Sequence, residues 1–164
     1  EALNVLRGFV EKIRTHPADE ALHPRHLAIM HALDHLQRLS HRCAQDARIE
    51  TLAVEPRLHR LSRLLLAAVE KCLDDGDYAS AERRFDRIRS LLRTERDTYR
   101  ARTVAAAAEQ AIDADETLRR LDSVRWLHRV SYHLWRITHY VHQAGTAMPD
   151  RPRVDEVALE IENE

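Results

Sequence analysis

Hydrophobic residues along this chain recur every three or four positions, which is the spacing of an α-helix with one apolar face. Prolines, glycines and short polar turns, which end helices, divide this pattern into segments. Reading from one division to the next predicts helices over about 1–16, 24–46, 56–75, 77–112 and 113–145. We therefore expect about five helices, each with one face turned to a shared core.

Several helix boundaries have specific signals. Pro24 and Pro56 suit the first turn of a helix, where the missing backbone N–H has no helical partner to lose. The turn Asp74-Asp75-Gly76-Asp77 is the strongest stop in the sequence, and its last residue is expected to cap the next helix. Asp113 or Asp115 opens the final helix, and Gly145 is expected to cap its end.

The predicted fold is an all-α, up-and-down antiparallel helical bundle, because short connections place consecutive long helices antiparallel. Only 3 Gly and 5 Pro occur among 164 residues, and half of the chain is Ala, Leu, Arg, Glu or Lys, as in long helices. The bundle is expected over 1–144, with an acidic tail or linker over 145–164. The longest strictly aliphatic run, 64–69, is too short to be a transmembrane segment. Cys43 and Cys72 are expected to be small core residues in a reducing compartment rather than a disulfide.

The charge balance excludes a global electrostatic function. Lysine and arginine total 26 against 27 acidic residues, so the net charge of −1 does not attract nucleic acid or anionic lipid. The arginines between residues 83 and 102 alternate with acids, which is typical of an ion-paired exposed face. No glycine-rich phosphate loop, nucleophile elbow or HExxH motif is present. We therefore predict no enzyme activity, and any anion preference must come from local clusters.

One internal match suggests a duplication. The segment HLQRLSH at 35–41 matches HLWRITH at 133–139, which lies 98 residues later, with four identical and two conservative positions out of seven. The offset predicts a repeated unit of about 100 residues. On this interpretation, residues 1–46 form a partial first repeat and 55–144 the second repeat.

A polar stripe follows one edge of the final predicted helix. Its members are separated by steps of four and three residues, and they are Arg125, Arg129, Tyr132, Arg136 and His139, with Arg38 in the first copy. Forked guanidinium groups in a stripe without carboxylates suit an anion such as phosphate. The simpler alternative is a solvated flank in which Asp34 and Arg38 form an ion pair.

A metal site is the third alternative for the stripe of the first copy. Histidines spaced along one helix can chelate zinc or nickel, and the candidate ligands are His31, Asp34, His35 and His41. The interspersed arginines would repel a cation, which disfavours this hypothesis. We therefore expect no cofactor.

The segments HALDHLQRLSHRC (31–43) and LHRVSYHLWRITHYVHQ (127–143) resemble the last helix of each three-helix repeat in PhoU-like domains of bacterial sodium/phosphate cotransporters, which are related to type II carriers. The resemblance implies a regulatory domain at the cytoplasmic face of the inner membrane, acting in phosphate transport through protein contacts or phosphate sensing. It implies the transporter portion of the same or another protein as partner, with phosphate and a second copy as further partners and no nucleic acid.

The family's acidic metal motif would fall at Asp34, Arg38, Tyr132 and Arg136. Three of these four residues are not carboxylates, so the family's metal cluster is not expected here. Two alternatives to the cotransporter domain stay open. One is a free-standing, metal-binding PhoU-type regulator of phosphate uptake, and the other is a purely structural dimerisation bundle.

Overall fold

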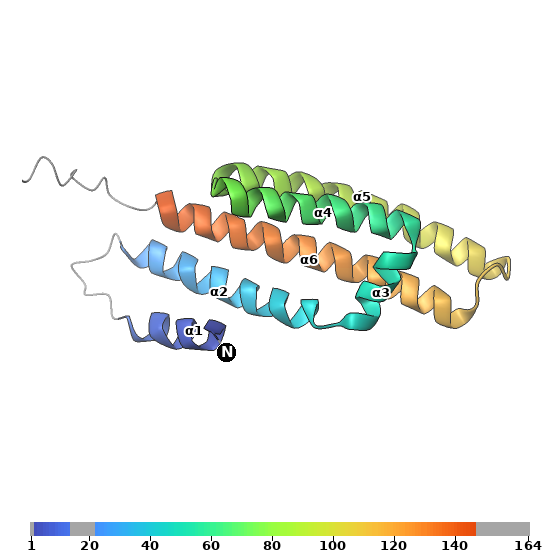
Figure 1. Cartoon of the computed structure of the whole chain (residues 1–164), viewed down its shortest axis with the longest axis horizontal. Coiled ribbons are helices and arrows are strands. Elements are labelled where there is room, and N and C mark those ends of the chain that lie inside the picture. Colours follow the sequence, from blue (N-terminus) through green and yellow to red (C-terminus); the bar gives the residue numbers. More distant parts are fainter. Residues whose placement is uncertain (1, 14–21, 147–164) are drawn as a thin grey trace, which may run out of the picture.

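The computed structural model describes residues 2–13 and 22–146, and it confirms the all-α prediction. Over this part of the chain it contains six helices and no strand (Figure 1). Their bounds are α1 Ala2–Lys12, α2 His23–Cys43, α3 Asp46–Val54, α4 Pro56–Asp75, α5 Tyr78–Ala108 and α6 Ala114–Thr146. The predicted extension of the first helix over 14–16 and the predicted tail from 147 onward lie outside the described residues.

Local chemistry explains where these helices begin and end. Gly76 ends α4 in the left-handed conformation, with φ of 63°. Asp77 then caps α5 by accepting a 3.0 Å hydrogen bond from the backbone N–H of Ser80. Asp113 caps α6 in the same way, with its Oδ1 2.7 Å from the nitrogen of Glu116. The predicted stop at Gly76 and the predicted starts at Asp77 and Asp113 are therefore confirmed, whereas α5 ends at Ala108 and not at about 112 as predicted.

Helix α6 is the central element of the bundle. It packs against α5 on one side and against α2 on the other, and it also contacts α3 and α4 (Figure 1). Consecutive long helices run in opposite directions, and α1 packs only on α2 apart from weaker contacts. One flank of α6 therefore faces residues of α5, and the opposite flank faces residues of α2.

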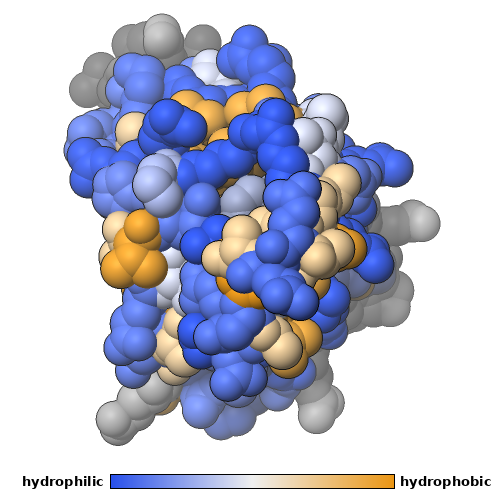
Figure 2. All heavy atoms as spheres, turned by 90° about the vertical axis from the view of Figure 1, so that its right-hand side faces the viewer, coloured by the Kyte–Doolittle hydropathy of each residue, from blue (hydrophilic) through white to orange (hydrophobic). Residues whose placement is uncertain are grey.

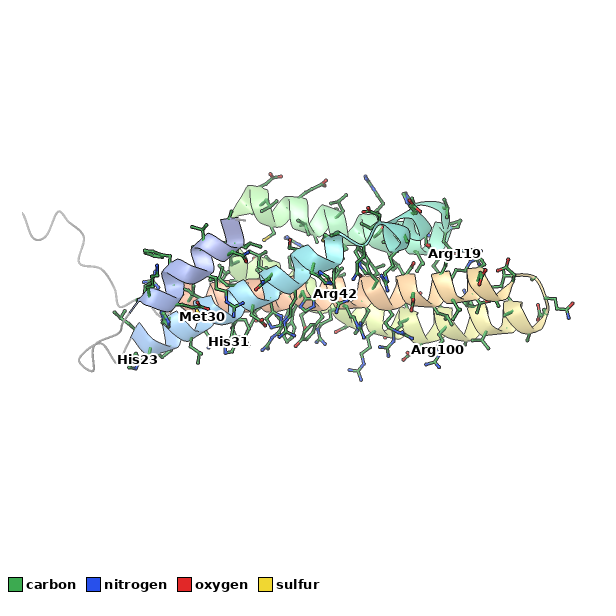
Figure 3. The ribbon with its side chains drawn as sticks, turned by 90° about the horizontal axis from the view of Figure 1, so that it is seen from below. His23, Met30, His31, Arg42, Arg100 and Arg119 are labelled. Atoms are coloured by element: carbon green, nitrogen blue, oxygen red, sulfur yellow. The ribbon has the colours of Figure 1, made fainter. Side chains whose placement is uncertain are left out.

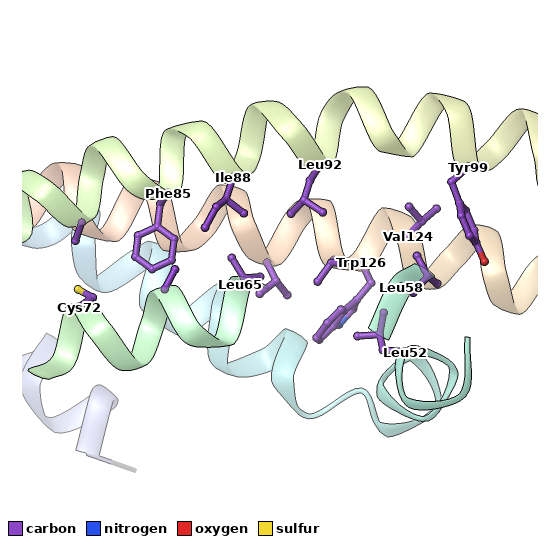
Figure 4. Close-up of a cluster of buried hydrophobic side chains, with 14 residues drawn as sticks. Leu52, Leu58, Leu65, Cys72, Phe85, Ile88, Leu92, Tyr99, Val124 and Trp126 are labelled. Carbon is purple, nitrogen blue, oxygen red and sulfur yellow. The ribbon is translucent and has the colours of Figure 1, made fainter. Parts of the chain in front are cut away.

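The core lies mainly among α4, α5 and α6 (Figure 4). Phe85, Leu58, Leu92 and Leu127 are the largest apolar side chains with almost no exposure to solvent. Burying side chains of this size contributes roughly 1.5–3 kcal/mol each before conformational entropy is counted. Among the described residues, no Asp, Glu, Lys or Arg is buried, so these charged side chains lie on the flanks of the helices, where the candidate site is found.

Three expectations from the sequence are corrected. Helix α3 is a sixth helix that the apolar pattern did not reveal, because its nine residues bury only Thr51 and Leu52. Gly145 lies inside α6, which continues to Thr146, so it is not a cap. Cys43 is exposed at the end of α2, where it lines an open apolar hollow with Leu39 and Leu65, whereas Cys72 is buried as expected.

In the described ranges 2–13 and 22–146, none of the helices combines the length and apolar character that a membrane crossing requires.

Candidate anion-binding site

The two matching segments face one another across the α2–α6 interface. His35 Nδ1 lies 3.1 Å from Nδ1 of His133, and these residues are equivalent under the 98-residue offset. Arg42 of α2 reaches the ring of His133, and its equivalent Tyr140 of α6 stacks with His35 at 5.9 Å between ring centroids. The contact between Arg42 and His133 therefore has an equivalent contact between Tyr140 and His35. Such paired contacts are expected where two antiparallel helices cross about a local two-fold axis.

Hydrogen bonding defines the protonation state of this histidine pair. Arg42 Nε donates to His133 Nε2 at 3.3 Å, so Nε2 carries no proton. The proton of a neutral His133 must then be on Nδ1, which donates to Nδ1 of His35. Burial lowers the pKa of His133 to about 4, with the charges of His35 and Arg42 adding to the effect. This pair is a neutral structural contact at physiological pH, not part of an anion site.

The two stripe residues nearest the C-terminal end of α6, Arg136 and His139, are also engaged in structural contacts. The guanidinium of Arg136 lies over the rings of Trp135 and Tyr140, at 5.4 and 4.5 Å from their centroids, and it donates to the hydroxyl of Tyr140. His139 and the nearby His142 donate to the two carboxylate oxygens of Glu82, at 2.8 and 2.7 Å. Arg136 and His139 are therefore separated from the rest of the stripe by their partners.

Glu82 is a carboxylate that periodicity along α6 could not have revealed, since it comes from α5. Burial works against its ionisation, but the hydrogen bonds from His139 and His142 outweigh this and lower the pKa of Glu82. A negative charge beside His139 opposes anion binding at that end of the stripe. The anion hypothesis is therefore confined to the other end.

The remaining stripe residues line a groove of about 550 Å³ between α5 and α6. The structure adds basic residues from α5 and a histidine from α6, so that the lining comprises Arg96, Arg100, Leu121, Val124, Arg125, His128, Arg129 and Tyr132. We call this the α5–α6 groove. Four guanidinium groups around one hollow give the forked, charged donors that phosphate oxygens accept.

A second, smaller hollow of about 150 Å³ lies on the other flank of α6. It is formed with the end of α2 and the start of α3, and its lining comprises Arg42, Gln45, Arg48, Asp122, Arg125, Trp126 and Arg129. We call it the α2–α6 groove. Arg125 and Arg129 line both grooves, so the two hollows adjoin along one ridge of α6.

The charges around the two grooves are strongly unbalanced. Six arginines line them, whereas Asp122 is the one carboxylate among the lining residues. Asp122 lies 3.4 Å from Arg125 and 4.0 Å from Arg48, and Asp97 pairs with Arg96 at 3.0 Å just outside the lining. Two carboxylates against six guanidinium groups leave an excess of positive charge in this region.

Two neighbouring groups are affected by this excess. Burial, together with the charges of Arg129, Arg48 and Arg38, lowers the pKa of Arg42. Burial and the charge of Arg96, with smaller effects from Arg89 and Arg93, lower the pKa of His128. In both cases the surrounding arginines disfavour one more positive charge, so the same surroundings would favour a bound anion.

The other predicted site residues are placed elsewhere. Arg38 forms the predicted ion pair with Asp34 at 2.9 Å, and the side chain of Arg38 is exposed while that of Asp34 is half-buried. His31 stacks on Tyr140, at 4.8 Å between ring centroids. His41 is exposed at the end of α2. Within the part of the chain that the structure describes, no three His, Cys, Asp or Glu side chains converge to hold a metal ion.

Sequence reasoning missed the basic residues that complete the site, namely Arg42, Arg48, Arg96, Arg100 and His128. Arg96 and Arg100 are one helical turn apart, but their run contains acids and was interpreted as an ion-paired face. That interpretation holds for part of the run, since Arg89 pairs with Asp86 at 2.7 Å and Arg96 pairs with Asp97 at 3.0 Å. The packing of α5 against α6 is what places Arg96 and Arg100 on a groove as well.

Fold and site together define an all-α helical bundle with adjoining arginine-lined grooves on its central helix. A comparison of the chain with protein-family models, curated proteins and solved structures finds no match in any of the three. Its function must therefore be argued from the grooves themselves and from the resemblance noted in the sequence.

Proposed function

We propose that this chain is a phosphate-sensing regulatory domain whose α5–α6 groove binds the anion. The observation that carries the proposal is the convergence of Arg96 and Arg100 of α5 with Arg125 and Arg129 of α6 around one hollow. Guanidinium groups hold phosphate through paired, charge-assisted hydrogen bonds. Burial, and then the charges of nearby arginines, lower the pKa of His128, and the neutral ring adds one further hydrogen-bond donor or acceptor.

The regulatory role rests on the resemblance to PhoU-like domains of sodium/phosphate cotransporters. On this proposal, the chain acts at the cytoplasmic face of the inner membrane and its partner is the transporter portion of the same or another protein. Binding of phosphate between α5 and α6 would change the affinity of the bundle for that partner, because a ligand held by two helices stabilises one arrangement of them. No catalytic step is required.

The test is thermal unfolding with and without phosphate at constant ionic strength. Phosphate at ten times its Kd stabilises the folded state by about 1.4 kcal/mol, which for a domain of this size raises Tm by roughly 3–6 °C. Arg129→Gln should abolish the rise, because it removes a guanidinium from the groove while keeping a polar side chain with the same first three carbons.

The matched control is Arg87→Gln. Arg87 is exposed on α5 and does not line either groove, so this variant should keep the full rise in Tm. Sulfate at the same ionic strength shows whether any divalent oxyanion is accepted. An unchanged Tm at millimolar phosphate would refute the proposal, and so would an equal rise in the Arg129→Gln protein.

One observation favours the dimerisation alternative as a second function. Helix α1 carries an exposed apolar surface formed by Ala2, Val5, Leu6 and Phe9, and the side chain of Phe9 is 65% exposed. Exposed apolar surface of this kind is typical of a contact with another protein. A second copy of this chain would bury it, and such an interface is compatible with anion binding on α6.

A further inference from the structure

The position of Arg125 and Arg129 determines how large a ligand the site can hold. These residues are one helical turn apart on α6, and each of them lines both the α5–α6 groove and the α2–α6 groove. The ridge that they form is therefore a shared wall between two basic hollows. Figure 3 labels Arg42 on α2 and Arg100 on α5, with the ribbon of α6 between the helices that carry them.

A single phosphate ion cannot use both hollows. The arginines of α2 and α3 and those of α5 approach α6 from different sides, because α2 and α5 pack on different sides of α6. One phosphate in the α5–α6 groove would leave Arg42 and Arg48 without a phosphate oxygen, and Asp122 is the only carboxylate among the described residues that line the α2–α6 groove beside them. A linear ligand with several phosphoryl groups would instead pass over the ridge and meet basic side chains in each hollow.

The charge and hydrogen-bonding groups of the smaller hollow agree with this arrangement. Six arginines and two nearby aspartates leave four positive charges, more than one phosphate neutralises. Gln45 also lines this hollow, and its side-chain amide is an uncharged hydrogen-bonding group beside Arg42 and Arg48.

We infer that the natural ligand is an oligophosphate, a linear anion of two or more linked phosphoryl groups that spans both grooves. This inference rests on the proposed function, because it assigns the α5–α6 groove to the first phosphoryl group. The α2–α6 groove receives the next groups along the chain. Arg125 and Arg129 contact the phosphate chain where it crosses the ridge of α6.

The test is calorimetric titration of the whole chain with orthophosphate, pyrophosphate and tripolyphosphate at constant ionic strength. Tripolyphosphate should bind at least tenfold more tightly than orthophosphate. Arg48→Gln, which changes only the α2–α6 groove, should weaken tripolyphosphate binding by fivefold or more and leave orthophosphate binding within twofold. Arg100→Gln, in the α5–α6 groove, should weaken both, and Arg87→Gln should weaken neither.

The outcomes separate the two proposals. If orthophosphate binds and tripolyphosphate binds no more tightly, the oligophosphate inference is wrong while the proposed function stands. An Arg48→Gln variant that binds tripolyphosphate as the parent does, with an unchanged melting curve, also overturns the inference. If no phosphate species binds, both proposals fail. ATP titrated in parallel distinguishes two sources of the oligophosphate. If ATP binds as tightly as tripolyphosphate, a nucleoside triphosphate can be the ligand, whereas weaker binding of ATP indicates an inorganic oligophosphate.

Discussion

Lowering the pH from 7 to 4 is expected to destabilise this bundle at His133. The pKa of His133 is about 4 in the folded chain, against about 6.5 in an unfolded one. Between these values the unfolded chain takes up a proton that the folded chain does not, so the free energy of unfolding falls as the pH falls. The difference corresponds to about 3 kcal/mol, which develops below pH 6.5 and is complete near pH 4.

The physical reason lies in the surroundings of His133, which is only 6% exposed. A proton added at Nε2 would replace the hydrogen bond from Arg42 by a repulsion between two cations. Arg38 and His35 also oppose the positive charge, and Asp34 alone among the charged groups that act on His133 favours it. The ring of Tyr132 packs at 5.6 Å and supplies no compensating charge.

Urea unfolding followed by circular dichroism at pH 7, 5.5 and 4 measures the effect. The parent protein should lose about 3 kcal/mol more than the His133→Gln variant over this range, because titration of the carboxylates is common to both. His59→Gln, which changes an exposed histidine on α4, should behave as the parent does. Equal losses in the parent and in His133→Gln would refute the argument from burial and the Arg42 bond.

Two further predictions concern the core and the surface of α1. Phe85→Ala should lower the free energy of unfolding, measured in urea, by about 3–5 kcal/mol, because Phe85 is 1% exposed and its removal leaves a cavity. A loss below about 1 kcal/mol would contradict the assignment of Phe85 to the core. If α1 forms the interface between two copies, Phe9→Asp should convert the dimer to a monomer, as measured by light scattering. A parent protein that is a monomer at every concentration would show that α1 forms no such interface.

Helix boundaries could be predicted where the local sequence contains a capping or turn-forming residue, and not elsewhere. Gly76 and Asp77 form a turn whose backbone and capping chemistry are local, and both act as predicted. Helix α3 lacks such a signal, since its N-cap, Gln45, makes no side-chain capping bond. Gly145 shows the opposite error, because a glycine near a helix end is a cap only where the chain turns left-handed, and here it does not.

The sequence by itself determined the all-α class and the placement of Arg125 and Arg129 on one face of a helix, because both follow from spacing along a single helix. The short connections further determined that consecutive long helices run antiparallel. Only the tertiary structure decided which charges face that ridge. Packing of α5 on α6 brought Arg96 and Arg100 to the arginines but Glu82 to His139, and so divided one predicted stripe into a basic groove and an ion-paired end. Periodicity describes one helix at a time, whereas a binding site depends on the helices beside it.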